Sequence, residues 1–230
     1  MRNLFISIIL LCIPLLFSCK PDLMEIEVYT SDVQSAGDGE ILEVPLKATF
    51  KLMGEDKDGQ LAKAVDIAKK YLSEDSEFSE ADGTFGKVLS IVTTAPIGTK
   101  KALINYMKKN PRPLMLEVSG NKITLKPGKS LKTLNSELSD INFMLGAKLP
   151  AESTIFRITS DSKKKATVSA IAVFSEKKPY LNYEKSIKRR KSVEIEFKGG
   201  GDSVYSEIDP LFSITLWNLN LMRELSMLKR

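Results

Sequence analysis

The sequence predicts an α+β fold, with antiparallel sheets and two amphipathic helices in the first half and a mostly β second half. Residues 42–52 alternate apolar and polar side chains, the longest period-two pattern in the chain and typical of a half-buried strand. Residues 61–72 and 131–145 instead repeat apolar side chains at helical spacing. After Pro150 short alternating runs dominate without regular strand–helix alternation, which favours antiparallel α+β over α/β.

Two strands and a helix are predicted first. Residues 25–33 alternate, and a glycine-rich turn at 36–39 leads into the strand 42–52. Pro45 removes a backbone donor from that strand, which favours an edge position or a bulge. Asp58 is the candidate N-cap of the helix that follows.

The middle of the chain predicts a loop, a strand, a short helix and a hairpin. Residues 73–86 are acidic and rich in small residues, so we expect a loop there. The β-rich run 87–94 predicts a strand, and 100–110 predicts a short basic helix. Gly120-Asn121 is a good hairpin turn between apolar strands at 114–118 and 123–125.

The rest of the chain begins with the second amphipathic helix and continues mainly as strands. Ser130 is its candidate cap, and Gly146 is its candidate C-terminal stop. Strands are then expected at 154–159, 166–174, 193–197 and 211–218, and a short terminal helix at 221–230. We place a region boundary between an α+β region, 19–148, and a β-rich region, 149–230.

The first residues have the pattern of a signal peptide. Arg2 precedes an apolar run at 4–17, which is shorter than the roughly 18–20 residues that a spanning helix needs. The run ends in Leu16-Phe17-Ser18-Cys19, which resembles a bacterial lipobox. The resemblance implies that residues 1–18 are removed, that Cys19 receives a diacylglyceryl thioether, and that the new amino terminus is acylated. The alternative is an uncleaved signal anchor or a buried apolar helix.

This interpretation sets the compartment and the chemistry of the mature chain. Lys20 stands where Asp commonly marks inner-membrane retention, so the outer membrane is favoured if the cell is Gram-negative. Cys12 falls in the removed segment and Cys19 is acylated, which leaves neither a free thiol nor a disulfide. Loss of Arg2 changes the net charge from +5 to +4, which favours solubility and does not imply a nucleic-acid partner.

Catalytic and metal-binding chemistry is restricted by the lack of histidine in the whole sequence. Ser-His-Asp and Cys-His catalysis are excluded, together with the commonest zinc ligand. The stretch 160–163 fits Ser-x-x-Lys, but the accompanying Lys-Thr-Gly is missing. The stretch 56–59 resembles part of a calcium loop whose first and last ligand positions hold non-ligating residues. We therefore assign no catalytic residue, no metal site and no cofactor.

A basic cluster late in the chain is the candidate contact surface. It comprises Lys188, Arg189, Arg190 and Lys191, with Lys185 just before them. Either it is a patch that faces a membrane or a partner, or it is a plain solvated loop. Aromatic residues for base stacking do not interleave with it, which argues against nucleic acid.

Several short motifs are spread along the chain. They are Cys19-Lys20-Pro21-Asp22, Thr30-Ser31-Asp32, Pro96-Ile97-Gly98, and Ile158-Thr159-Ser160-Asp161-Ser162 leading into Val168 and Pro179. In these motifs the chain resembles, over most of its length, a family of small, uncharacterised bacterial lipoproteins that are often encoded in prophages of enteric bacteria. The resemblance implies a small envelope lipoprotein and transfers no catalytic residue.

These observations together predict a lipid-anchored, non-enzymatic protein of the bacterial cell envelope that serves as an interaction or binding module. Its expected partners are membrane lipid, through acylated Cys19, and an envelope protein. One alternative is a carrier of lipid or a small ligand, with an apolar groove between sheet and helices. A second is a hydrolase that uses carboxylates or a Ser–Lys pair.

Overall fold

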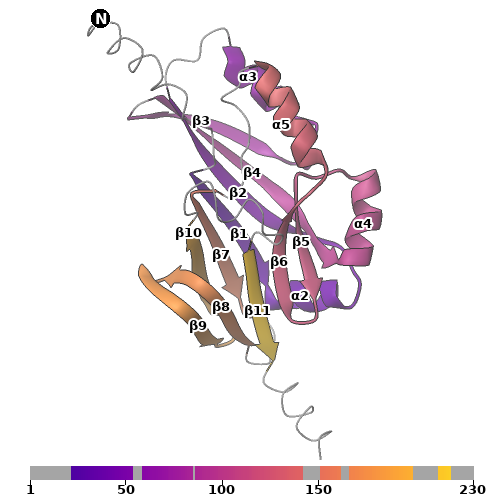
Figure 1. The fold of residues 1–230 in the computed structure, drawn as a ribbon, viewed down its shortest axis with the longest axis vertical. Coiled ribbons are helices and arrows are strands. Elements are labelled where there is room, and N and C mark those ends of the chain that lie inside the picture. The colour runs from indigo at the N-terminus through magenta and orange to yellow at the C-terminus, as the bar shows by residue number, and fades with distance from the viewer. Residues whose placement is uncertain are drawn as a thin grey trace, which may run out of the picture.

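The computed structural model of the chain describes residues 22–53, 59–84, 86–141, 151–161, 166–198 and 212–218. They form a mixed α+β fold, in which four helices pack on one curled sheet of eleven strands (Figure 1). The described helices are α2 (Thr30–Gly37), α3 (Gln60–Lys69), α4 (Lys100–Lys109) and α5 (Ser130–Ile141). The described strands are β1 (Leu23–Tyr29), β2 (Leu42–Met53), β3 (Glu77–Gly83), β4 (Gly86–Thr99), β5 (Leu114–Ser119), β6 (Lys122–Pro127), β7 (Ser153–Thr159), β8 (Ala166–Ser175), β9 (Lys178–Ile187), β10 (Ser192–Lys198) and β11 (Phe212–Asn218).

The sheet curls until its two ends meet. Its strand order is β10-β7-β1-β2-β4-β5-β6-β11-β8-β9, with β3 paired to β4. The first and the penultimate strands of this order also pair, through Glu196 of β10 and Phe174 of β8. Ala172 of β8 has a positive φ of 54°, between the residues that pair with β11 and the one that pairs with β10. This bend lets the two halves of β8 bond to different strands.

The prediction of antiparallel sheets is wrong in two places. β1 pairs in parallel with β7, and β4 pairs in parallel with β5. The second pair follows from local connectivity, because β4–α4–β5 is a strand–helix–strand crossover, which parallel strands require. The first pair joins strands about 130 residues apart. The predicted regions 19–148 and 149–230 therefore contribute neighbouring strands to one sheet.

The hydrophobic core lies inside the curl of the sheet. Alternate residues of β1 point inward, and Met24, Ile26 and Val28 are fully buried. Phe156 of β7 meets Phe197 of β10 edge to face, with ring centroids 5.9 Å apart. Nearly every strand of the curl adds buried apolar side chains to this cluster, and α2 adds two more. The interior is thus occupied by the protein's own side chains.

Three of the four described helices match predicted ones, and α2 does not. Helix α3 buries Leu61 against β4, and Ala64 packs against α5. Its N-cap is Gly59, while the predicted cap Asp58 lies outside the described residues. Helix α5 begins at Ser130, the residue predicted as its cap, and the Ser130 hydroxyl has no hydrogen-bond partner among the described residues. Gly146 and the terminal helix at 221–230 also lie outside the described residues.

Two further segments correct the sequence analysis. Residues 30–37 form helix α2 instead of the end of a strand and a turn, because the polar run after Tyr29 supplies its cap. Residues 77–83 form β3 instead of a loop, and their mostly exposed side chains explain why no alternation is visible.

Strand β2 lies between β1 and β4, so the edge position predicted from Pro45 is wrong. The explanation is in the register. The β2 residues that pair with β1 begin at Leu46, so Pro45 lies one residue before this pairing. The missing N–H of Pro45 therefore leaves the β1–β2 ladder intact.

Candidate functional site

The predicted lipidation site precedes the described part of the chain. Leu16, Phe17, Ser18 and Cys19 lie outside the described residues, which begin at Asp22. That residue is firmly held, because its carboxylate accepts a hydrogen bond from the Lys51 backbone N–H and lies 3.4 Å from the Lys51 ammonium group.

The backbone of Asp22 is held as well. Its N–H donates to Thr49 and its carbonyl accepts from Ser153. Two residues therefore separate Cys19 from a fixed point, a span of about 10 Å even when extended.

The basic cluster forms the turn between β9 and β10, which we call the basic turn (Lys188–Lys191). All four side chains are exposed, and within the described part of the chain none of them forms an ion pair with a carboxylate. Arg190 adopts a positive φ of 59°. Its N–H donates to the Ser160 carbonyl at 2.6 Å, and Ser160 N–H donates to the Lys191 carbonyl at 3.0 Å. The end of β7 therefore fixes the backbone of the turn, while its charges remain in solvent.

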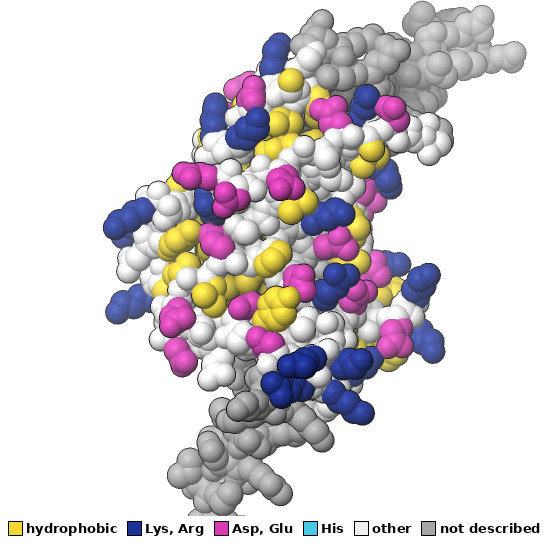
Figure 2. All heavy atoms as spheres, turned by 180° about the vertical axis from the view of Figure 1, so that it is seen from behind, with side chains coloured by type: hydrophobic (Ala, Val, Ile, Leu, Met, Phe, Trp, Pro, Cys, Tyr) yellow, Lys and Arg dark blue, Asp and Glu magenta, His cyan; other side chains and the backbone are white. Residues whose placement is uncertain are grey.

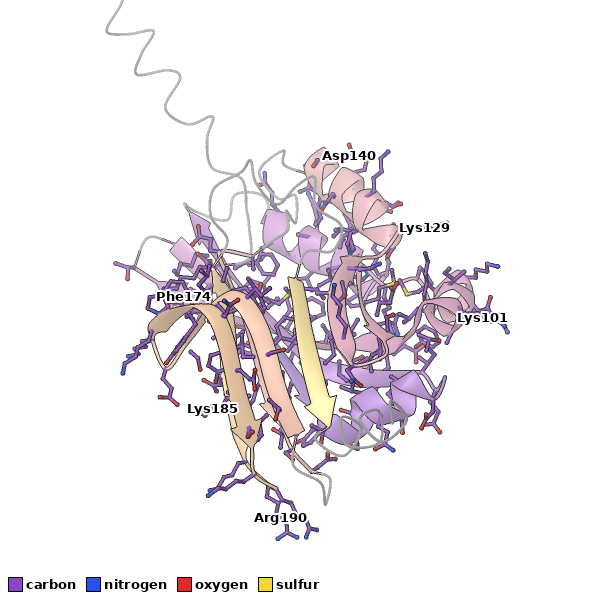
Figure 3. All side chains as sticks on the ribbon, turned by 60° about the horizontal axis from the view of Figure 1, so that its bottom comes forward. Lys101, Lys129, Asp140, Phe174, Lys185 and Arg190 are labelled. Carbon is purple, nitrogen blue, oxygen red and sulfur yellow. The ribbon has the colours of Figure 1, made fainter. Side chains whose placement is uncertain are left out.

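The basic turn and the start of the described chain lie at opposite ends of the same strands. β1 and β7 run in parallel, with Leu23 opposite Ser153 and Tyr29 opposite Thr159. Ser192, which directly follows the basic turn, pairs with Thr159. Six residue steps along these strands correspond to about 20 Å. Figure 3 shows Arg190 at the lower extremity of the molecule, and Figure 2 shows Lys and Arg side chains gathered at that end.

The outer face between these two ends is rich in carboxylates. Glu25 and Glu27 alternate with the buried residues of β1, and Glu194 and Glu196 do the same on β10. Arg157 on β7 donates two hydrogen bonds to Glu194, at 2.7 and 3.0 Å, and this raises the pKa of the guanidinium. Lys47 also pairs with Glu25 on this face, so part of its negative charge is neutralised, whereas the cations of the basic turn form no ion pair within the described residues.

Asp161 connects the end of β7 to the first turn of α2, beside the basic turn. Its carboxylate accepts hydrogen bonds from the Thr30 hydroxyl at 2.8 Å, the Ser31 N–H at 3.0 Å and the Ser31 hydroxyl. Asp32 completes the cap by accepting from the Tyr29 N–H at 2.9 Å. The N-terminus of α2 is therefore already occupied by the protein's own carboxylates.

The pKa values of these two carboxylates move in opposite directions. Burial raises the pKa of Asp32, the hydrogen bond from Tyr29 lowers it, and the charge of Asp161 raises it further, so the net pKa is raised. Burial also acts to raise the pKa of Asp161, but the hydrogen bonds from Ser31 and Thr30 together outweigh it and the net pKa is lowered. The lowered pKa of Asp161 therefore follows from its capping of α2, whereas the raised pKa of Asp32 follows from burial and from the nearby charge of Asp161.

The Ser-x-x-Lys stretch does not present a nucleophile to solvent. The Ser160 side chain is fully buried, and its hydroxyl has no hydrogen-bond partner among the described residues. Lys163 lies outside the described residues. Within the described residues no three metal-ligating side chains converge, and no helix there is long and apolar enough to cross a membrane.

The sequence analysis predicted β8 but missed its partner β9. The hairpin of β8 and β9 stands out from the body of the sheet (Figure 1), and no strand was predicted over residues 178–187. Because β9 is exposed on both faces over most of its length, its sequence shows no clear alternation. The available signal was Glu176-Lys177, a polar pair directly after the predicted strand 166–174.

Comparisons with known proteins identify no relative. No protein-family model matches the chain, and searches of curated proteins and of solved structures find no significant match.

Proposed function

We propose that this chain is a lipid-anchored, non-enzymatic binding module of the bacterial envelope, attached to the membrane through Cys19 and presenting the basic turn to a partner. The prophage-type lipoprotein resemblance and the preference for the outer membrane are part of this proposal. The chain lacks histidine, and its cysteines are those at 12 and 19, so the usual nucleophilic triads cannot be built.

The observation that carries the proposal is the separation of the two ends of β1 and β7. If Cys19 is acylated, Asp22 is held within about 10 Å of its lipid. The basic turn then extends about 20 Å further along the strands, beyond a carboxylate-rich face. Such an arrangement directs four exposed cations away from the anchoring leaflet. A membrane-apposed role for this patch is correspondingly disfavoured.

The filled interior favours this proposal over the carrier alternative. A carrier needs an apolar cavity or groove for its ligand, typically of several hundred cubic ångströms. Inside the curl of the sheet, side chains such as Phe156, Leu116 and Ile195 are fully buried against one another in one continuous cluster. The filled interior therefore favours a protein that binds its partner at its surface over a carrier that encloses a ligand.

Anchoring is tested by comparing the full chain with Cys19→Ala in a bacterial host. We expect the unmodified chain in the membrane fraction with added acyl mass, and the variant unacylated and released from it. If both chains show the same mass and distribution, the anchoring proposal is wrong.

Orientation is tested with a single introduced cysteine, which is uniquely reactive because mature Cys19 would be blocked by lipid. A fluorophore at Arg190→Cys or at Lys51→Cys is measured by energy transfer to acceptor lipids in proteoliposomes. Lys51 lies beside Asp22, so its label should transfer strongly, whereas the label at position 190 should transfer much less. Equal transfer from the two positions would contradict the proposed orientation.

A further inference from the structure

The β8–β9 hairpin combines exposed apolar side chains with a free strand edge. Leu181 is 77% exposed and Ile171 is 69% exposed, the two highest values for large apolar side chains in the described part of the chain. Tyr180 is exposed beside them. In the described sheet, β8 is the one strand that pairs with β9, so the opposite edge of β9 is free of a strand partner.

The hairpin geometry indicates which backbone groups face outward. Glu176 and Lys177 both have positive φ, which is the two-residue turn that matches strand twist. In such a hairpin the flanking residues, Ser175 and Lys178, form a hydrogen-bonded pair, and the pairs then alternate. The N–H groups of Leu181 and of the odd-numbered residues after it therefore point to the free edge. Pro179 occupies the first outward position and offers no N–H.

Charge decides what kind of strand can pair there. Residues 176–191 contain seven Lys or Arg and two Glu, a net charge of +5, which equals that of the entire chain. Glu176 is engaged by Lys185 at 2.8 Å, and the basic turn continues directly from the end of β9. Lysines and proline on an edge strand disfavour pairing with a second copy of the same strand. An acidic strand meets no such repulsion.

We propose that the free edge of β9 binds an extended, acidic segment of an envelope protein as an added strand. Its backbone pairs with the outward groups of β9, an apolar side chain contacts Leu181, and its carboxylates are attracted by the net positive charge of residues 176–191. This inference rests on the proposed function and names the partner class for the same end of the molecule.

The test uses the purified full chain in detergent and a fluorescein-labelled octapeptide that alternates Glu and Val. We expect binding that weakens in 0.5 M salt, and at least about tenfold weaker binding of the matched peptide with Lys in place of Glu. A third peptide, N-methylated at alternate residues, keeps the charge but loses backbone donors. It should also bind at least about tenfold more weakly, because strand addition depends on main-chain hydrogen bonds.

Protein variants distinguish binding at the free edge of β9 from nonspecific electrostatic attraction of the peptide. Leu181→Asp should weaken binding of the acidic peptide at least about fivefold, and its high exposure makes the variant safe for folding. Val92→Asp is the matched control, an exposed apolar residue on β4, and should bind as the unmodified chain does.

Three results would overturn the inference. They are equal binding of the N-methylated peptide, equal binding of the Lys peptide, and binding to phosphatidylglycerol vesicles in place of any peptide. We expect Cys19→Ala to bind the peptide as the unmodified chain does. Absence of the unmodified chain from the membrane would therefore contradict the anchoring proposal, and absence of peptide binding would contradict strand addition at β9.

Discussion

Asp161 stabilises the fold by capping α2 from a distant part of the chain, and Asp161→Asn tests this. The residue follows β7, yet three of its hydrogen bonds come from Thr30 and Ser31 in the first turn of α2. Asn retains one acceptor oxygen but loses the negative charge that favours a helix N-terminus. We expect Asp161→Asn to reduce the free energy of unfolding by about 1 kcal/mol, within the range for helix caps, with solvent screening keeping it well below a buried ion pair.

The dependence of this effect on pH follows from the direction of the pKa shift. The pKa of Asp161 is lower in the folded chain than its ordinary value, so the folded state favours the ionised form. Its stabilising contribution is therefore complete above about pH 5 and is lost as the pH falls below about 4, through the folded pKa. The difference in free energy of unfolding between the unmodified chain and Asp161→Asn should therefore shrink as the pH falls below about 4, since the variant has no carboxylate to protonate.

The assay is urea unfolding followed by far-UV circular dichroism at pH 7.0 and at pH 3.5. Asp75→Asn, in an exposed turn after α3, is the matched control and should change stability by less than about 0.5 kcal/mol. A double-mutant cycle with Ser31→Ala should give a coupling energy of about 0.5–1 kcal/mol. The capping argument fails if Asp161→Asn behaves as the control does, or if its effect is the same at both pH values.

Three other changes test separate parts of the structure. Glu137→Gln should lower the Tm and bring the pKa of Tyr71 down toward its ordinary value in a spectrophotometric titration, since the hydrogen bond to Glu137 is the main cause of the raised pKa; an unchanged titration would contradict that bond. Phe156→Ala, at a fully buried position, should cost about 3–5 kcal/mol in urea unfolding, and a loss below 1 kcal/mol would contradict its place in the core. Ala172→Gly should preserve or raise stability by up to about 1 kcal/mol because it relieves a positive φ, whereas Ala170→Gly in the same strand should lower it by about that amount; the reverse order in thermal melts would contradict the bend in β8.

Elements with one buried face were predictable from the sequence. The alternation over 42–52 and the apolar stripes of α3 and α5 each report a single face packed on a core, and their positions hold in the structure. Strands β3 and β9 are exposed over most of their surface, so their sequences lack the alternation of apolar and polar residues that predicts a strand. Helix α2 is only eight residues long and buries Val33 and Ala36, which is too short a stripe to stand out.

The candidate site was predictable in its chemistry and not in its place. Four consecutive cations predict an exposed segment, and the basic turn, Lys188–Lys191, is exposed. Where that turn lies relative to Cys19 depends on the parallel pairing of β1 with β7, about 130 residues away. A long-range pairing of this kind leaves no local pattern. The capping role of Asp161 has the same origin, since its partners Thr30 and Ser31 lie across that pairing.

The energetics of anchoring give a further reason to assign the basic turn to a partner. Each buried acyl CH₂ contributes about 0.8 kcal/mol, and more than one chain gives stable membrane attachment. If the chain is acylated as proposed, four cations near an anionic leaflet would add about 1 kcal/mol each, a small increment to a protein held by its lipid. At the distal end the same four cations would act on a partner that the anchor keeps at high local concentration, where a weak contact is enough for occupancy. An added strand on β9 needs only such modest intrinsic affinity, which is why the peptide measurement should be made at low salt and over a wide concentration range.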